Sequence, residues 1–351
     1  MIFALKSYFC RMKILYYLLL SSLLIAGFSN CANDFELTTG ATNKPVVYGF
    51  LSPTDTATYI RVEKAFVDEN TSALELAQRP EELYYDDIEV VLSAGSNAYR
   101  LIQVDGADEG YPRDPGVFVN IPNTLYKLTL PVGQNYEGGQ DYRLTITDAS
   151  ADTLLTEATT TIVHTPTIQF PRENDDFEWR SSIEGQNDIR TQWRFDNRTA
   201  AIFDLRIQFN YEEAVNGDLN NRVDKSVIFT VLKNIEPEDE DDTSITVEIL
   251  ATDILNGIAG AVDANSPGPR FFTNMEVVVD AGSKELLDFI NVGQANTGLT
   301  GASVPPIFSN IPNGFGLFSS RNSASVGGLI LVGEAKDSLL DGRFTNQLNF
   351  Q

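Results

Sequence analysis

Hydrophobic and polar residues alternate with a period of two over most of the chain beyond its N-terminal region, which is the pattern of half-buried β-strands. Within residues 57–66, for example, Ile60 and Val62 alternate with Arg61 and Glu63. The strands predicted in the first half lie at 45–51, 57–66, 87–104 (a hairpin about Gly95-Ser96-Asn97), 116–121, 124–130, 141–148 and 153–163. Roughly eight short strands separated by turn residues indicate a β-sandwich of the immunoglobulin or fibronectin type, placed at 45–164.

Two local signals refine this first half. Tyr142 follows the turn sequence GGQD and precedes the alternating Leu144 and Ile146. This arrangement is similar to the tyrosine corner of such sandwiches, a structural feature in which the phenol bonds back to the backbone. Residues 71–80 are the best helix candidate, with Ser72 as N-cap, a capping-box Glu75 and Pro80 at the end.

The second half is also mostly β in pattern. A polar segment with two prolines, 165–188, marks the predicted linker, and 189–351 is the predicted second domain. The elements predicted there are strands at 189–196, 201–213 (bulged), 225–233, 244–251, 270–282, 313–321 and 326–335, and helices at 252–262 and 283–292.

The N-terminus has the pattern of an export signal. Residues 14–28 are apolar and follow Arg11 and Lys13, and the run is too short for a membrane span of about 20 residues. Translation could start at Met1 or at Met12. We therefore predict a signal peptide at 1–30.

Cys31 lies where this apolar run ends, in the sequence FSNC. This sequence resembles the loose lipobox of Bacteroidota lipoproteins, although Phe28 and Asn30 depart from the usual residues. The resemblance implies that Cys31 carries the acyl chains of a lipid anchor, with residues 31–44 as a polar tether; two or more chains anchor a protein stably. The alternative is an ordinary signal peptide with an incidental cysteine.

The residues after Cys31 bear on location. Ala32 stands where enteric bacteria place the aspartate that retains lipoproteins at the inner membrane. Asp34 and Glu36 resemble the short acidic signal that sends Bacteroidota lipoproteins to the cell surface. We expect an outer-membrane protein at the cell surface, with the periplasmic face as the alternative.

Charge and composition exclude several functions. The chain has 49 acidic and 25 basic residues, and cleavage before Cys31 removes three bases, giving 22 − 49 = −27. Such a chain repels nucleic acid and anionic lipid headgroups. The mature chain would keep one cysteine, Cys31, and one histidine, His164, so it can form no internal disulfide and no Cys/His zinc site. We predict no cofactor and no metal.

Four patterns could carry chemistry, and each has a simpler explanation. His164 could serve a Ser-His-Asp device, but a boundary histidine is favoured. The acidic run 236–242 lacks the ligand spacing of a calcium loop, so a solvated hairpin loop is favoured. The Gly-x-Gly of 313–318 lacks a third glycine, which favours turn glycines or a close backbone approach. No pair of carboxylates stands out for glycosidase chemistry.

Three segments together resemble a family of uncharacterised Bacteroidota outer-membrane lipoproteins: KPVVYGFLSPTDTATYIRVEKAF, YRLTITDASADTLLTEATT and FSNIPNGFGLFSSR. The resemblance covers nearly all of the mature chain. It implies an Ig-like N-terminal sandwich and frequent association with TonB-dependent receptors, and it assigns no catalytic residue.

Three functions follow as hypotheses. The first is a non-enzymatic accessory or ligand-capturing partner of a TonB-dependent transporter. The second is a structural or adhesive surface module, and the third is a glycan hydrolase that uses carboxylates. Exposed aromatic residues at loop tips would suit either of the first two. The candidates are Tyr84, Tyr85, Tyr111, Phe177 and Trp179.

Overall fold

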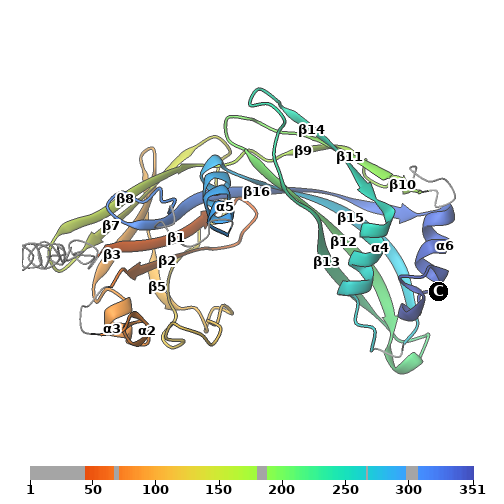
Figure 1. Ribbon diagram of the computed structural model, residues 1–351, viewed down its shortest axis with the longest axis horizontal. Helices are drawn as coiled ribbons and strands as arrows, with labels where there is room; N and C mark the ends of the chain where they lie inside the picture. The colour runs from red at the N-terminus through yellow and green to blue at the C-terminus, as the bar shows by residue number, and fades with distance from the viewer. Residues whose placement is uncertain (1–43, 67–70, 180–187, 266–267, 298–306) are drawn as a thin grey trace, which may run out of the picture. The chain divides into compact units, whose positions relative to one another are not determined.

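The protein is mainly β with a few short helices, as its sequence predicts (Figure 1). The computed structural model describes residues 44–66, 71–179, 188–265, 268–297 and 307–351. No helix within these ranges is long and apolar enough to cross a membrane.

The first half is a sandwich of two sheets. Its eight strands are β1 (Pro45–Leu51), β2 (Thr58–Lys64), β3 (Ile88–Ala94), β4 (Asn97–Arg100), β5 (Ile102–Asp105), β6 (Thr124–Leu128), β7 (Asp141–Asp148) and β8 (Thr153–Thr161). One sheet has the order β1-β2-β6-β5 and the other β4-β3-β7-β8. This is the ABED and C′CFG order of an immunoglobulin-type sandwich. The predicted strand count and the hairpin at Gly95-Ser96 are confirmed.

Alternating residues of the two sheets meet in one apolar core. Val47 and Ile60 come from the first sheet, and Leu92 and Leu144 from the second; all four are fully buried. Tyr142 is also buried, and its hydroxyl interacts with the backbone of Glu137. This is the contact that the predicted tyrosine corner requires.

In its described residues, the second half contains two layers of strands and three α-helices. Its elements are β9 (Thr167–Phe170), β10 (Asp176–Phe177), β11 (Asp188–Arg194), β12 (Ile202–Ala214), β13 (Arg222–Ile235), β14 (Ser244–Leu250), α4 (Ala251–Ala261), β15 (Arg270–Gly282), α5 (Lys284–Thr297), β16 (Phe315–Leu331) and α6 (Gly333–Asp341), with short 3-10 helices at Val215–Gly217 and Asn346–Leu348. The antiparallel order β13-β12-β15-β16 forms one layer, and β14-β11-β9 forms another.

The core of this half lies between those layers and beneath α4 and α6. On β12, Phe203, Leu205 and Ile207 point into it, so that Asp204 and Arg206 point out. The predicted bulge in this strand is confirmed, because its register with β13 shifts on both sides of Leu205. The strand thus carries core residues on one face and charged residues on the other.

The 17-residue strand β16 joins the two halves. It pairs in parallel with β1 and antiparallel with β15, so one continuous sheet runs β13-β12-β15-β16-β1-β2-β6-β5 (Figure 1). Residues 315–331 therefore belong to the sheet of both halves, and the predicted linker 165–188 carries β9 and β10. The boundaries predicted between the two domains stay a prediction.

Three local predictions are wrong. Residues 116–121 form no strand, because Gln78 and the backbone of Ala77 hold this segment against helix α2 (Ala73–Leu76). The helix predicted at 71–80 is two short helices: Ser72 caps α2 as predicted, but Pro80 begins α3 (Pro80–Leu83) instead of ending a single helix. The strand predicted at 326–335 ends at Leu331, and residues 333–335 begin helix α6 instead.

The acidic run 236–242 is not a hairpin loop. It connects β13 to β14, and these strands pair with β12 and β11 in different sheets. The run is therefore a crossover between the two layers. Its exposed carboxylates remain in solvent, as the prediction of a solvated loop requires.

Candidate ligand-binding groove

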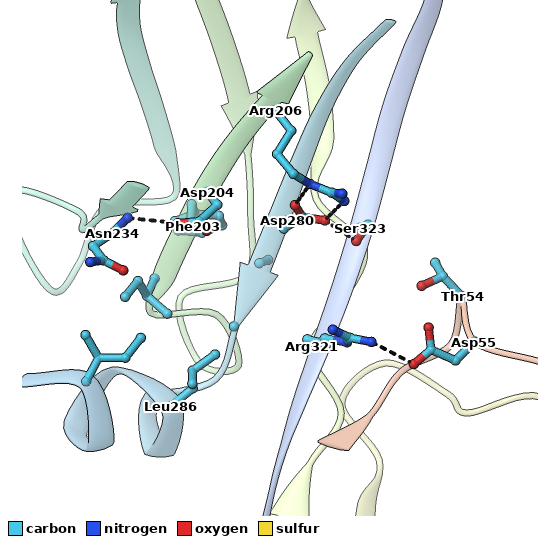
Figure 2. Close-up of a pocket in the computed structure, with 14 residues that line it drawn as sticks. Thr54, Asp55, Phe203, Asp204, Arg206, Asn234, Asp280, Leu286, Arg321 and Ser323 are labelled. Atoms are coloured by element: carbon cyan, nitrogen blue, oxygen red, sulfur yellow. Dashed lines mark hydrogen bonds and ion pairs between the residues drawn. The ribbon is translucent and has the colours of Figure 1, made fainter. Parts of the chain in front are cut away.

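The outer face of the continuous sheet is hollowed where the two halves join. A hollow of about 400 Å³ lies over β12, β15 and β16, beside α5 and the loop after β1 (Figure 2). Its lining is Thr54, Asp55, Ile202, Phe203, Asp204, Arg206, Asn234, Asp280, Ala281, Gly282, Leu286, Ile290, Arg321 and Ser323. The polar residues on the strands lie here because the apolar residues that alternate with them point to the core.

The floor of this hollow is a row of paired polar groups. The guanidinium of Arg206 on β12 binds both carboxylate oxygens of Asp280 on β15, one of them at 2.6 Å. Ser323 on β16 donates to the same carboxylate at 2.6 Å. Figure 2 shows the three side chains on neighbouring strands. A bidentate arginine–carboxylate pair has a fixed geometry, so the floor is preorganised.

A second hollow of about 690 Å³ adjoins the first and shares Thr54, Asp55 and Arg321 with it. The shared ion pair joins Arg321 Nη2 on β16 to Asp55 Oδ2 on the loop after β1, at 3.0 Å. The Arg321 side chain is 55% exposed, so most of its donors face solvent. We call the two hollows together the groove.

Tyrosines line the second hollow. The rings of Tyr59 and Tyr111 lie 4.9 Å apart between centroids, and Tyr111 is 56% exposed. Tyr48 on β1 contacts Phe289 of α5 edge-on at 6.4 Å. Leu286 and Ile290, on the same helix, face the first hollow. The groove thus combines aromatic and aliphatic surface with fixed polar groups, as ligand sites generally do.

A hydrogen-bonded triad orients Tyr59. Glu109 accepts from the Tyr59 hydroxyl at 2.8 Å and from Lys127 Nζ at 2.5 Å. Burial, followed by the nearby Glu109 carboxylate, raises the pKa of Tyr59, whereas the hydrogen bond from Lys127 lowers the pKa of Glu109. Tyr59 is therefore a neutral donor at neutral pH, held in a fixed position.

Most of the aromatic residues predicted at loop tips are not exposed. Only Tyr111 is. Tyr84, Phe177 and Trp179 are buried, and Tyr85 packs partly against the sandwich core. Phe177 and Trp179 belong to the second core, because β10 pairs with β16 and draws its neighbours inward. The sequence alone could not show this pairing.

His164 lies near the junction, packed against Gly138 and Gly139. Its Nδ1 is 3.3 Å from Thr199 Oγ1 and 3.5 Å from Asp196 Oδ2. A catalytic triad needs the nucleophile on one ring nitrogen and the carboxylate on the other. Both groups here contact the same nitrogen, so this arrangement is not that of a triad.

Asp196 is held by a second partner, Arg198, with contacts of 2.9 and 2.6 Å. The hydrogen bond from Arg198 is the main cause that lowers the pKa of Asp196 to about 2. The ionised Asp196 carboxylate therefore stabilises the folded state. This contribution is fully present above the unfolded-state pKa of about 3.9 and is lost as the pH falls towards the folded-state pKa.

Substitution of Arg198 with alanine is expected to raise the pKa of Asp196 towards its usual value, measured by NMR titration of the side-chain carboxyl. The stability at pH 7 should change little, because the Arg198 side chain is 81% exposed. Arg190→Ala is the matched control, since Arg190 pairs with Gln192 instead. An unchanged Asp196 titration in Arg198→Ala would contradict this account.

The remaining sequence patterns do not converge on a site. Gly316 of the Gly-x-Gly has a φ of +113°, and a Cβ there would lie 1.9 Å from the carbonyl oxygen of Val47. This confirms the predicted close backbone approach. Among the described residues, no three His, Cys, Asp or Glu side chains form a group that could hold a metal ion. Cys31, Asp34 and Glu36 lie outside the described residues.

Sequence reasoning missed the groove itself. Its residues come from the loop after β1 and from β2, β12, β15, β16 and α5, which are far apart in the chain. One usable signal existed: on β12 and β15, charged residues occupy the positions that alternate with core residues, at Arg206 and Asp280. Their pairing depends on strand order, which the pattern does not contain.

Comparison with known proteins gives no family. No family model matches the chain, and no curated protein is similar to it. Among solved structures, the calcium-binding domain CBD12 of CALX1.1 aligns at 8% identity over 82% of this chain and 99% of its own, with a TM-score of 0.16. CBD12 of CALX1.2 aligns at 8% identity over 80% and 99%, with a TM-score of 0.17. Likenesses this weak carry no argument about fold or function.

Proposed function

We propose that this protein is a lipid-anchored outer-membrane lipoprotein that binds without catalysis, as an accessory or ligand-capturing partner of a TonB-dependent transporter. Cys31 would carry the anchor, with Asp34 and Glu36 directing the protein to the cell surface. The observation that carries the binding role is the groove. The location and the partner rest on the N-terminal sequence pattern and on the family resemblance.

The groove supports binding because its polar groups are fixed and its charges nearly cancel. Its ionisable lining comprises the acids Asp55, Glu109, Asp204 and Asp280 and the bases Arg61, Arg206 and Arg321. Aromatic walls beside fixed polar groups are the usual lining of a ligand site.

The same contacts disfavour the glycan hydrolase. A glycosidase needs one carboxyl to donate a proton and a second to act as nucleophile or base. Asp280 already accepts from Arg206 and Ser323, and Asp55 accepts from Arg321. Both carboxylates thus hold the groove together and are not presented freely to a substrate.

The test is copurification from native membranes. The wild-type chain, with Cys31 intact, carries a tag at its C-terminus and is extracted in several mild detergents. The tag needs a flexible linker, because Phe350 is buried and the Gln351 amide donates to the Arg270 carbonyl at 2.9 Å. We expect a TonB-dependent barrel to copurify in stoichiometric amount.

Two controls separate the parts of the proposal. Cys31→Ala should move the protein out of the membrane fraction if Cys31 is the anchor. Arg321→Ala should leave the anchor intact while altering the groove. Recovery of the lipoprotein alone in every detergent would reject a stable transporter complex and favour a solitary surface module.

A further inference from the structure

Exposed apolar side chains gather at one end of the sandwich, which we call the proximal end because β1 begins there. They come from α2, from the segment between β5 and β6, and from the start of β8. Their exposed fractions are 64% for Leu74, 50% for Val117, 43% for Phe118, 76% for Ile121 and 60% for Leu154. A group of exposed large apolar side chains marks a surface that contacts a membrane, a ligand or another protein.

Strand pairing places these segments at the same end. Pro45, which begins β1, is opposite Lys64, which ends β2. Lys64 Nζ in turn donates to the carbonyl of Glu81 in α3. Lys64 also lines a small hollow with Asp148 and Leu155, next to Leu154. The helices α2 and α3, the turn between β7 and β8, and the start of β1 therefore share the proximal end.

The exposed segment is held rigidly. Gln78 donates to the carbonyl of Val117 at 2.6 Å, and the Val119 amide donates to the carbonyl of Ala77 at 2.9 Å. The guanidinium of Arg113 lies 5.3 Å from the centroid of the Phe118 ring. These contacts fix the backbone while leaving the apolar side chains in solvent. The fold therefore holds these apolar side chains in exposed positions.

The opposite end of the sandwich differs. Its loops are residues 52–57, 95–96 and 129–140. Among the described residues in these loops, Val132 is the single exposed large aliphatic side chain. Elsewhere on the first half Ile102 is exposed on β5, and Tyr48 and Tyr111 line the groove, so the proximal end carries five of the nine exposed large apolar side chains among the described residues of this half.

The length of the N-terminal segment indicates what the proximal end meets. From Cys31 to Lys44 there are 44 − 31 = 13 residues, which reach at most about 45 Å when fully extended. An anchor at Cys31 therefore holds this end within about 45 Å of the bilayer. We infer that the proximal end rests on the lipid surface, with Leu74, Phe118 and Ile121 entering the headgroup region of the leaflet. Apolar side chains bind such an interface by burying area at the acyl boundary.

Charge determines which lipid suits this end. Glu81, Asp86 and Asp87 are exposed beside the apolar group. They repel an anionic surface, so the contact fits zwitterionic headgroups. Anionic lipid is expected to weaken it.

The inference rests on the proposed lipid anchor, and the experiment separates the two. The lipidated protein is bound to protein-free vesicles of phosphatidylcholine and phosphatidylethanolamine. Ile121→Cys carries an environment-sensitive fluorophore, and Val132→Cys is the matched control at the opposite end. The new thiol is the only free one, because Cys10 is removed with the signal and Cys31 is acylated. Brominated lipid serves as a contact quencher.

We expect a blue shift and quenching at position 121 and neither at position 132, with a smaller shift when anionic lipid is added. Flotation with the vesicles but equal emission at both positions would overturn the inference and leave the anchor standing. Failure to float would overturn both. A shift at position 121 in native membranes but not on protein-free vesicles would also overturn it, because a protein would then cover this end.

Discussion

Replacing Gly316 with alanine is expected to destabilise the protein by about 3 kcal/mol. Gly316 lies opposite Val47 in the parallel pairing of β16 with β1. Its φ of +113° is strained for any residue with a Cβ, and that Cβ would lie 1.9 Å from the Val47 carbonyl oxygen. Relief of the clash requires β16 and β1 to separate, and this pairing is what joins the two halves.

Urea unfolding followed by fluorescence measures this loss. Gly293→Ala in α5 is the matched control, because nothing lies within 4 Å of a Cβ at Gly293 and its φ is ordinary. The control should be neutral or slightly stabilising, since alanine favours a helix over glycine by up to about 1 kcal/mol. If the two variants unfolded at the same urea concentration, the close approach of β16 to β1 would be wrong.

A strand or helix could be predicted from the sequence where a single regular pattern of apolar and polar residues runs along its whole length. Strand β15 and helix α4 match their predictions closely, because each buries a single apolar face against the same core. The β4 hairpin follows from Gly95, whose positive φ suits a tight turn. For these elements, the residues of the element itself are sufficient to predict its structure.

Strand β16 could not be predicted as one element. The pattern predicts two strands, at 313–321 and 326–335, and the polar residues Ser319, Ser320 and Asn322 lie at or beside the break between them. All three are buried, because their side chains bond to groups far away in the chain. Ser320 donates to the carbonyl of Thr161 at 2.6 Å, and Asn322 donates to that of Val163 at 2.9 Å. A buried polar residue with such a partner behaves as a core residue, and sequence alone does not reveal the partner.

The segment 116–121 shows the opposite error. Its apolar residues predict a half-buried strand, but Val117, Phe118 and Ile121 are exposed. Nothing in the pattern distinguishes an apolar residue that enters the core from one that stays exposed on the surface. The groove was missed for a related reason: its charged residues are adjacent only because β12, β15 and β16 are neighbours in the sheet.

Replacing Arg270 with methionine is expected to cost about 3–5 kcal/mol, the range for removing one partner of a buried ion pair. The Arg270 side chain is 1% exposed and binds Glu213 Oε2 on β12 at 2.9 Å. It also donates to the carbonyls of Leu348 and Asp263. Methionine fills similar space but leaves Glu213 and both carbonyls without these donors.

The contrast with Arg222 isolates burial as the cause. Arg222 on β13 pairs with Glu212 on β12 at 3.1 Å, but both side chains are more than a third exposed. Arg222→Met should therefore cost no more than about 1 kcal/mol. Urea unfolding compares the two variants, and hydrogen exchange of the Gln351 amide, which donates to the Arg270 carbonyl, reports whether the C-terminus detaches. Equal losses would show that Arg270 acts only as a surface charge. A larger loss for Arg270→Met, partly recovered when Glu213→Gln is added, is the result expected if the cost comes from removing the Arg270 charge beside Glu213.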